Sequence, residues 1–153
     1  MTDEISRAWA YLSRVAEPPC PELRVLGTQV GPVEAAERVR SGDVDDDVAR
    51  RTEARRQIDC AAQDLEILDR MGGRLVAADD AEWPLLAFNS FRSIDDRPQA
   101  HEPMVLWAVG SASLDEVSYR AAAIVGTRAA TAYGEFVAAD LAAGLATRDA
   151  AVV

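Results

Sequence analysis

The sequence contains no lysine, only two cysteines and one histidine, and each shortage excludes a class of protein. Cys20 and Cys60 lie far apart and His101 stands alone, so neither a disulfide framework nor a zinc site is predicted. There is no run of about 18 apolar residues, and the first amphipathic stretch starts with acidic residues instead of a basic segment and an apolar signal core. These absences predict a cytoplasmic protein without metal, cofactor or membrane contact.

The charge balance limits the way in which the chain could bind nucleic acid. All sixteen basic residues are arginine, and twenty-six acidic residues bring the formal charge to −10. A general electrostatic attraction to phosphate is therefore disfavoured, and any DNA site is expected to be local. With 153 residues, 49% of them apolar, the chain can form a core as one ordinary domain or two small ones.

The first 72 residues predict helices separated by strong breakers. One helix starts at Thr2 or Asp3 and carries apolar residues at steps of three and four, which form a single stripe. A second helix follows Gly31 and stops at Gly42. The longest helix is predicted over residues 45–72, with three aspartates at its start.

The apolar pattern changes after Gly73, which sets the predicted domain boundary between residues 1–72 and 73–153. Three short strands are expected beyond it, and the last two are continuous apolar runs typical of strands buried on both faces. In order, the strands are predicted at 74–77, 104–109 and 121–125, with a polar loop over 89–103.

The last apolar run leads directly into a glycine loop that ends at Gly134, where helical spacing resumes. Strand, glycine loop and helix in this order open a Rossmann-like unit. Gly126 permits close approach of the backbone to a ligand, and the N-terminus of the following helix favours an anion. The loop therefore predicts a phosphate site.

Four side chains of this loop suit a nucleic-acid ligand. Thr127 and Thr131 offer hydroxyl donors, Arg128 has a planar fork suited to phosphate oxygens, and Tyr133 could stack on a base. In the alternative interpretation, Thr131 only caps the helix, Arg128 is solvated and Tyr133 packs against the bundle. Residue spacing leaves both interpretations open.

The segment from Val125 to Gly134 resembles the V-G-S-R-x-x-S-x-Y-G signature of the DNA-processing protein A (DprA) family, with threonine at both serine positions. Upstream residues resemble the family elements D-x-x-Y-P-x-x-L and P-x-x-L-x-x-x-G in the right order, with Trp83 in place of the usual tyrosine. These residues are Asp79, Trp83-Pro84, Leu86, Pro103, Leu106 and Gly110-Ser111.

The resemblance implies an α+β or α/β protein with two parts. A helical domain like a sterile-alpha-motif (SAM) or helix-hairpin-helix fold would precede the first part of an extended Rossmann-like domain. It also implies a non-enzymatic protein of natural transformation that protects incoming single-stranded DNA, helps to load a RecA-type recombinase and forms a homodimer at full length. The residues implied to contact DNA are Gly126, Thr127, Arg128, Thr131, Tyr133 and Gly134.

The resemblance also implies that the chain ends inside the Rossmann-like domain, because the family continues into a Ser-Gly-Gly-Ala-type loop. We therefore expect an apolar strand edge near Val125 or Val153 to be covered by another copy or by irregular packing. A second function class is a nucleotide-processing enzyme of the lysine-decarboxylase-like phosphoribohydrolase group. Its P-G-G-x-G-T-x-x-E motif, which would supply a catalytic carboxylate, does not occur in this sequence.

Other candidate residues have simpler interpretations. The arginines between Arg50 and Arg56 alternate with acidic residues, which is typical of a solvated helix face. His101 has no nucleophile beside it, so no catalytic role is predicted. The three tryptophans have apolar neighbours and are expected in the core.

Overall fold

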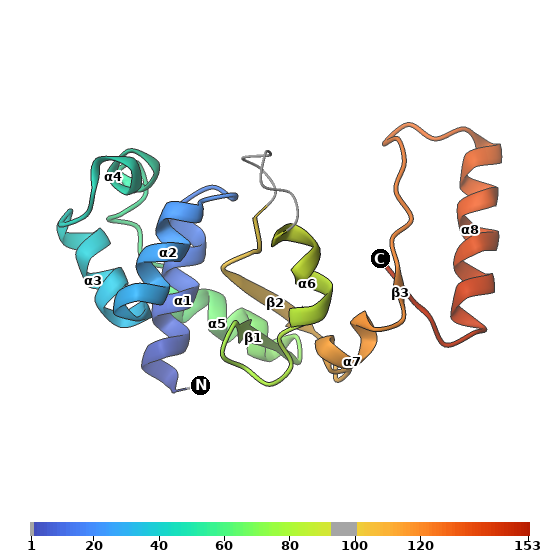
Figure 1. The fold of residues 1–153 in the computed structure, drawn as a ribbon, viewed down its shortest axis with the longest axis horizontal. Coiled ribbons are helices and arrows are strands. Elements are labelled where there is room, and N and C mark those ends of the chain that lie inside the picture. The colour runs from blue at the N-terminus through green and yellow to red at the C-terminus, as the bar shows by residue number, and fades with distance from the viewer. Residues whose placement is uncertain (1, 93–100) are drawn as a thin grey trace.

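The computed structural model describes residues 2–92 and 101–153. Figure 1 shows a helical bundle, a two-stranded hairpin beside it and a strand-helix-strand unit at the C-terminal end. Helices and small sheets are thus combined along one chain, which confirms the expected mixture of α and β structure. Up to residue 72 the described residues form helices joined by turns and loops, with no strand among them. The first strand begins at Gly73, where the apolar pattern changes.

The bundle forms because short amphipathic helices bury their apolar sides against one another. Helix α1 starts where the sequence predicts, and the Thr2 hydroxyl oxygen accepts a hydrogen bond from the Ile5 N–H at 3.4 Å. Helix α3 ends at Gly42, whose left-handed φ of 82° closes the helix as predicted. The five helices are α1 (Asp3–Val15), α2 (Pro21–Val30), α3 (Pro32–Ser41), α4 (Asp46–Thr52) and α5 (Ala61–Arg70).

The single long helix predicted over residues 45–72 is wrong. Turns over residues 53–60 separate α4 from α5, and the Tyr11 hydroxyl donates a hydrogen bond of 2.7 Å to the Arg56 carbonyl within them. The sequence has no glycine or proline at this break, so breaker residues did not reveal it. Alanines are the only apolar residues between Val48 and Ile58, so the sequence does not continue the apolar stripe of a helix there.

Strands β1 (Gly73–Ala77) and β2 (Val105–Val109) form an antiparallel hairpin with the bundle on one face. Its other face packs on the small helix α6 (Leu85–Arg92) and the turn before it. Toward the bundle the hairpin contributes Leu75, Ala77 and Val105 to the main core. On the opposite face Val76 and Ala108 pack with Trp83, and Leu106, Phe88 and Leu114 lie around them.

Three sequence predictions for this region need correction. Strand β2 is buried on both faces only in part, because Val105 and Ala108 are covered from opposite sides whereas the bundle does not reach the end of the strand. Trp107 is 40% exposed and Val109 is 58% exposed, whereas Trp9 and Trp83 are buried as expected. The predicted polar loop over 89–103 begins too early, since residues 89–92 belong to α6, and residues 93–100 lie outside the described part.

The C-terminal unit is a small parallel β-α-β arrangement. Strands β3 (Ala121–Ala122) and β4 (Ala151–Val152) pair in parallel, and α8 (Ala132–Ala146) connects them. The short helix α7 (Leu114–Ser118) leads from the hairpin into this unit. Strand, loop and helix follow in the predicted order, but the strand expected over 121–125 is shorter.

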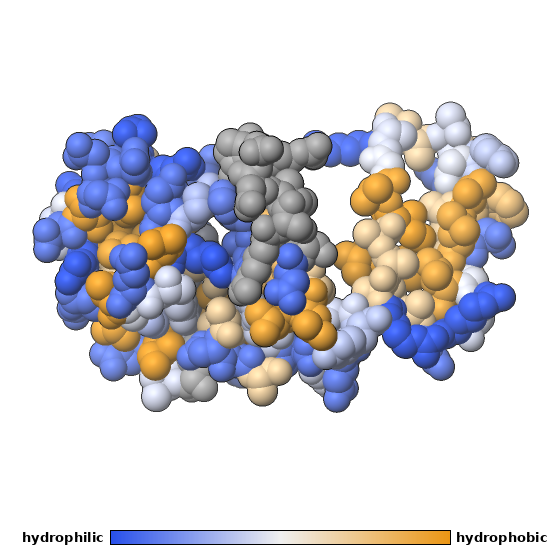
Figure 2. Space-filling view, in the orientation of Figure 1, coloured by the Kyte–Doolittle hydropathy of each residue, from blue (hydrophilic) through white to orange (hydrophobic). Residues whose placement is uncertain are grey.

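The C-terminal unit leaves many apolar side chains exposed. Val125 is 89% exposed, so the run over 121–125 is not buried on both faces as predicted. Figure 2 shows apolar residues gathered on α8 and on the strands beside it. Apolar residues surround α8 instead of forming one stripe, which is typical of a helix buried on several sides. Within the described residues no helix is both long and apolar enough to cross a membrane.

Candidate nucleic-acid interface

The candidate loop connects β3 to α8 and lies at the carboxyl end of its strand. Pairing with β4 continues into the loop, since the Ile124 N–H donates to the Val153 carbonyl at 2.8 Å. The Val153 N–H in turn donates to the Ala122 carbonyl at 3.0 Å. The backbone is thus fixed on the strand side, and the six predicted site residues lie in the loop and the first turn of α8.

Two threonine hydroxyls shape the loop and the start of the helix. The Thr127 Oγ1 accepts a hydrogen bond from the Ala129 N–H, and the Thr131 Oγ1 accepts one from the Gly134 N–H, each at 3.2 Å. Thr131 is therefore the N-cap of α8, as the alternative interpretation proposed. Capping uses the oxygen as an acceptor, so the hydroxyl proton is still available to a ligand oxygen.

Capping leaves the helix N-terminus partly unsatisfied. Within the described residues, the N–H groups of Ala132 and Tyr133 have no hydrogen bond to the protein. These N–H groups carry the partial positive charge of the helix dipole. Glu135 brings one negative charge to the same turn, so an anion here would also need a cationic side chain.

Gly126 is not required by the internal structure of the loop. Its φ lies outside the left-handed region, and a Cβ added to it would meet no atom within 4 Å. The glycine therefore leaves open space beside the backbone, as close approach of a ligand would require.

Arg128 and Tyr133 both face solvent. Tyr133 is 77% exposed, so the alternative in which it packs against the bundle is wrong. Arg128 is exposed as well, and it forms no ion pair with any residue that the structure describes. Their exposure leaves a guanidinium and an aromatic ring accessible on one loop.

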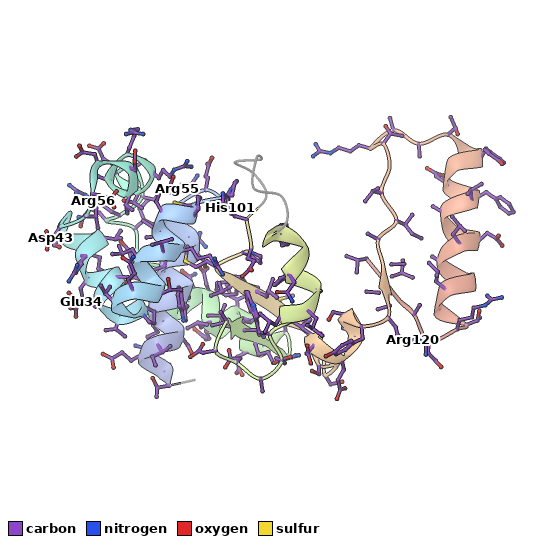
Figure 3. The ribbon with its side chains drawn as sticks, viewed as in Figure 1. Glu34, Asp43, Arg55, Arg56, His101 and Arg120 are labelled. Atoms are coloured by element: carbon purple, nitrogen blue, oxygen red, sulfur yellow. The ribbon has the colours of Figure 1, made fainter. Side chains whose placement is uncertain are left out.

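Three of the four arginines in the basic cluster around α4 pair with neighbouring carboxylates. Arg50 pairs with Asp47 at 2.9 Å, and Arg55 pairs with Glu17 at 2.6 Å. In the same cluster, Arg51 approaches Glu22 at 3.3 Å. Figure 3 shows Arg55 and Arg56 on the bundle and Arg120 in the C-terminal unit.

The net charge is distributed unevenly along the chain. Residues 120–153 contain three arginines and three acidic residues, so the formal charge of −10 belongs entirely to residues 1–119. The candidate loop therefore lies in the neutral part of an acidic chain. The six charged residues are Arg120, Arg128, Arg148, Glu135, Asp140 and Asp149.

Sequence reasoning missed an ion-pair network on the hairpin. Arg74 and Glu82 form a two-pronged pair, and hydrogen bonding to Arg74 lowers the pKa of the Glu82 carboxyl. Eight residues separate them with no helical periodicity, so the sequence carried no signal of the pairing. His101 is exposed, and its neighbour Glu102 pairs with Arg24. In the part of the chain described here, no three potential ligands cluster to hold a metal.

Comparison with known proteins gives a consistent result. A family model described as DNA recombination-mediator protein A matches residues 74–153. Two proteins named as DNA processing protein DprA, from Mycobacterium tuberculosis strains CDC 1551 / Oshkosh and ATCC 25618 / H37Rv, are each 65% identical to this chain over 155 residues. The match covers the whole chain and 40% of each relative's length. No solved structure gives a significant match.

Proposed function

Because the chain belongs to the DNA recombination-mediator protein A family, we propose that residues 126–134 bind the phosphate backbone of single-stranded DNA. In this proposal the α8 N-terminus and the Arg128 guanidinium hold a phosphate, and the Thr127 and Thr131 hydroxyls donate to its oxygens. Gly126 allows the backbone to approach the ligand, and Gly134 keeps the first helical turn free of a side chain. Tyr133 stacks on an adjacent base.

One observation carries the proposal, namely the unpaired state of Arg128. Ten other arginines, all within residues 7–74, form ion pairs with carboxylates. Arg128 has no such partner in the described residues; Arg56, Arg120 and Arg148 have none either, but Arg128 lies just before a helix N-terminus, where an anion is favoured. A guanidinium without a carboxylate can bind phosphate without first breaking an ion pair.

For the longer protein we propose the role that the family description suggests. It would act in the cytoplasm without catalysis of its own, protect incoming single strands, help a RecA-type recombinase onto them and form a homodimer. We also propose that residues 1–72 form a SAM-like or helix-hairpin-helix-like helical domain and that residues 73–153 begin a Rossmann-like domain. The parallel β3-α8-β4 unit supports the second assignment. The family match favours this role over the phosphoribohydrolase alternative.

The test replaces Arg128 in the full chain and measures affinity for a labelled oligonucleotide. Loss of a charge-assisted hydrogen bond costs about 1.5–3 kcal/mol, so Arg128→Ala should weaken binding roughly 10- to 100-fold for any sequence. The slope of log affinity against log salt should fall by about 0.7. Arg128→Lys should recover only part of the affinity, because a point charge lacks the two-pronged geometry.

The control variant is Arg7→Ala, which removes an exposed arginine that pairs with Asp3 at 3.0 Å on α1. This variant should bind the oligonucleotide like the wild type. Thermal melting of each variant separates lost binding from lost folding. Wild-type affinity in a folded Arg128→Ala variant would remove Arg128 from the site.

A further inference from the structure

Arg74 connects three segments that are far apart in the sequence. Its Nε donates to Glu82 Oε1 at 2.6 Å, and a second guanidinium nitrogen donates to the other carboxylate oxygen. The same guanidinium donates to the carbonyl of Gly110 and, at 2.7 Å, to the carbonyl of Ala112. A strand, a turn and the segment after β2 are therefore held by one side chain.

Glu82 extends this network to the start of α7. Its Oε2 accepts a hydrogen bond from the Leu114 N–H at 3.4 Å, so the carboxylate contacts both Arg74 and the helix. Both side chains are partly shielded, with 32% of Arg74 and 23% of Glu82 exposed. Gly110 has a φ of 107°, a conformation that favours glycine, and this turn presents its carbonyl to Arg74. We call Arg74, Glu82 and their contacts to residues 110–114 the clamp.

The clamp lies where the chain leaves the hairpin for the C-terminal unit. Among the described residues, no side-chain hydrogen bond or ion pair joins residues 120–153 to residues 2–112. Arg120 donates instead to the Arg148 carbonyl at 2.6 Å, within the C-terminal unit. Figure 1 shows the chain passing through α7 into this unit. The direction of residues 110–118 therefore determines where the unit lies.

We propose that Arg74 and Glu82 are positioning residues that set the orientation of the β3-α8-β4 unit relative to the bundle and hairpin. Its relevance to DNA rests on the proposed function, because the unit carries the candidate loop. The acidic part of the chain repels phosphates at distances up to about 10 Å at 0.1 M salt. A fixed orientation keeps the loop at a constant distance from that charge.

The two kinds of contact in the clamp make different demands on position 74. The ion pair needs only opposite charges, whereas the Gly110 and Ala112 carbonyls need a donor that reaches them from β1. An exchanged pair, Arg74→Glu with Glu82→Arg, keeps the charges but leaves the carbonyls without that donor. If Arg74 and Glu82 act only as an ion pair, the exchanged pair should behave like the wild type. If they position the unit through the two carbonyls, the exchanged pair should not recover this function.

The experiment measures the distance between spin labels on α1 and α8 in the full chain. Labels attach at Glu4→Cys and Asp140→Cys, both exposed, with Cys60→Ser in the background and Cys20 buried. The wild-type clamp should give one narrow distance distribution. Arg74→Met and the exchanged pair should both broaden it, and Arg74→Lys should broaden it less.

The matched control is Arg38→Met, which removes an exposed ion pair with Glu34 of similar length, 2.8 Å, on α3. This control should keep the narrow distribution. Circular dichroism checks that each variant is folded. If Arg74→Met does not fold, the distance distribution of Arg74→Lys tests the proposal instead. An unchanged distribution in the folded clamp variants overturns the proposal, as does full recovery in the exchanged pair. DNA affinity of the wild type is measured separately, so failure of the DNA proposal leaves the distance result intact.

Discussion

Replacement of Thr131 by aspartate tests helix capping and phosphate binding separately. Thr131 caps the helix through a 3.2 Å hydrogen bond from the Gly134 N–H, and an aspartate at the N-cap accepts the same bond. The negative charge of the aspartate also interacts favourably with the positive end of the helix dipole. Thr131→Asp should therefore keep the helix and exclude a phosphate, whereas Thr131→Ala should lose the cap and retain part of the binding.

The size of each effect follows from the geometry. Loss of the N-cap in Thr131→Ala costs about 1 kcal/mol of helix stability. In Thr131→Asp, a carboxylate about 5 Å from a bound phosphate repels it by ~0.8 kcal/mol in water and ~3.3 kcal/mol at an effective dielectric constant of about 20. DNA affinity should then fall by about four-fold to about two-hundred-fold.

Two measurements on the same protein samples test this reasoning. Thermal melting should rank Thr131→Asp with the wild type and Thr131→Ala below both. Titration of a labelled single strand at two salt concentrations should place Thr131→Asp as the weakest binder, with a larger deficit at low salt because the repulsion is electrostatic. Wild-type affinity in Thr131→Asp would refute a phosphate at this helix N-terminus.

Two further predictions concern the clamp and its turn. Gly110→Ala should destabilise the chain by about 1 kcal/mol or more because its φ is 107°, while Gly126→Ala, with open space around it, should melt like the wild type. Equal melting temperatures for these two variants would contradict the turn geometry. Glu82 has a lowered pKa in the folded chain, chiefly through its hydrogen bond with Arg74, so its stabilisation is present at neutral pH. That contribution should fade as the pH drops below about 4.3, and denaturant unfolding of wild type and Glu82→Gln should converge in acid; a constant difference would exclude Glu82 as the titrating group.

Local chemistry determined the features that the sequence predicted well. The Thr2 cap, the left-handed Gly42 and the change of pattern at Gly73 act within a few residues, so their effect is visible in the sequence. The turns after α4 contain both local hydrogen bonds and a contact to Tyr11, which is 45 residues from Arg56 and cannot be read from the local sequence. The Arg74–Glu82 pair joins a strand to the turn that follows it, a spacing with no helical periodicity to reveal it.

Burial was the least predictable property, for a related reason. Val125 and Trp107 lie in apolar runs, and such runs indicate strands covered on both sides when neighbouring strands are present. Among the described residues, the bundle and α6 cover β2 at Val105 and Ala108 on opposite faces, but Trp107 stays partly exposed and Val125 is almost fully exposed. The sequence pattern shows what a strand could bury, and the elements that pack on its two faces decide what it does bury.

The uneven charge sets a condition on the DNA site that we propose, which would have to be small and well placed. Residues 1–119 carry the whole formal charge of −10, so bringing a strand toward the bundle adds repulsion with every phosphate that comes within about one Debye length. The neutral C-terminal unit avoids this repulsion only if it holds its loop away from the acidic surface. Ion pairs hold most arginines of the bundle to its own carboxylates, whereas Arg128 has none within the described residues. The proposed local site on a neutral unit, with its direction fixed by the proposed clamp, would therefore let an acidic protein of this composition bind a polyanion.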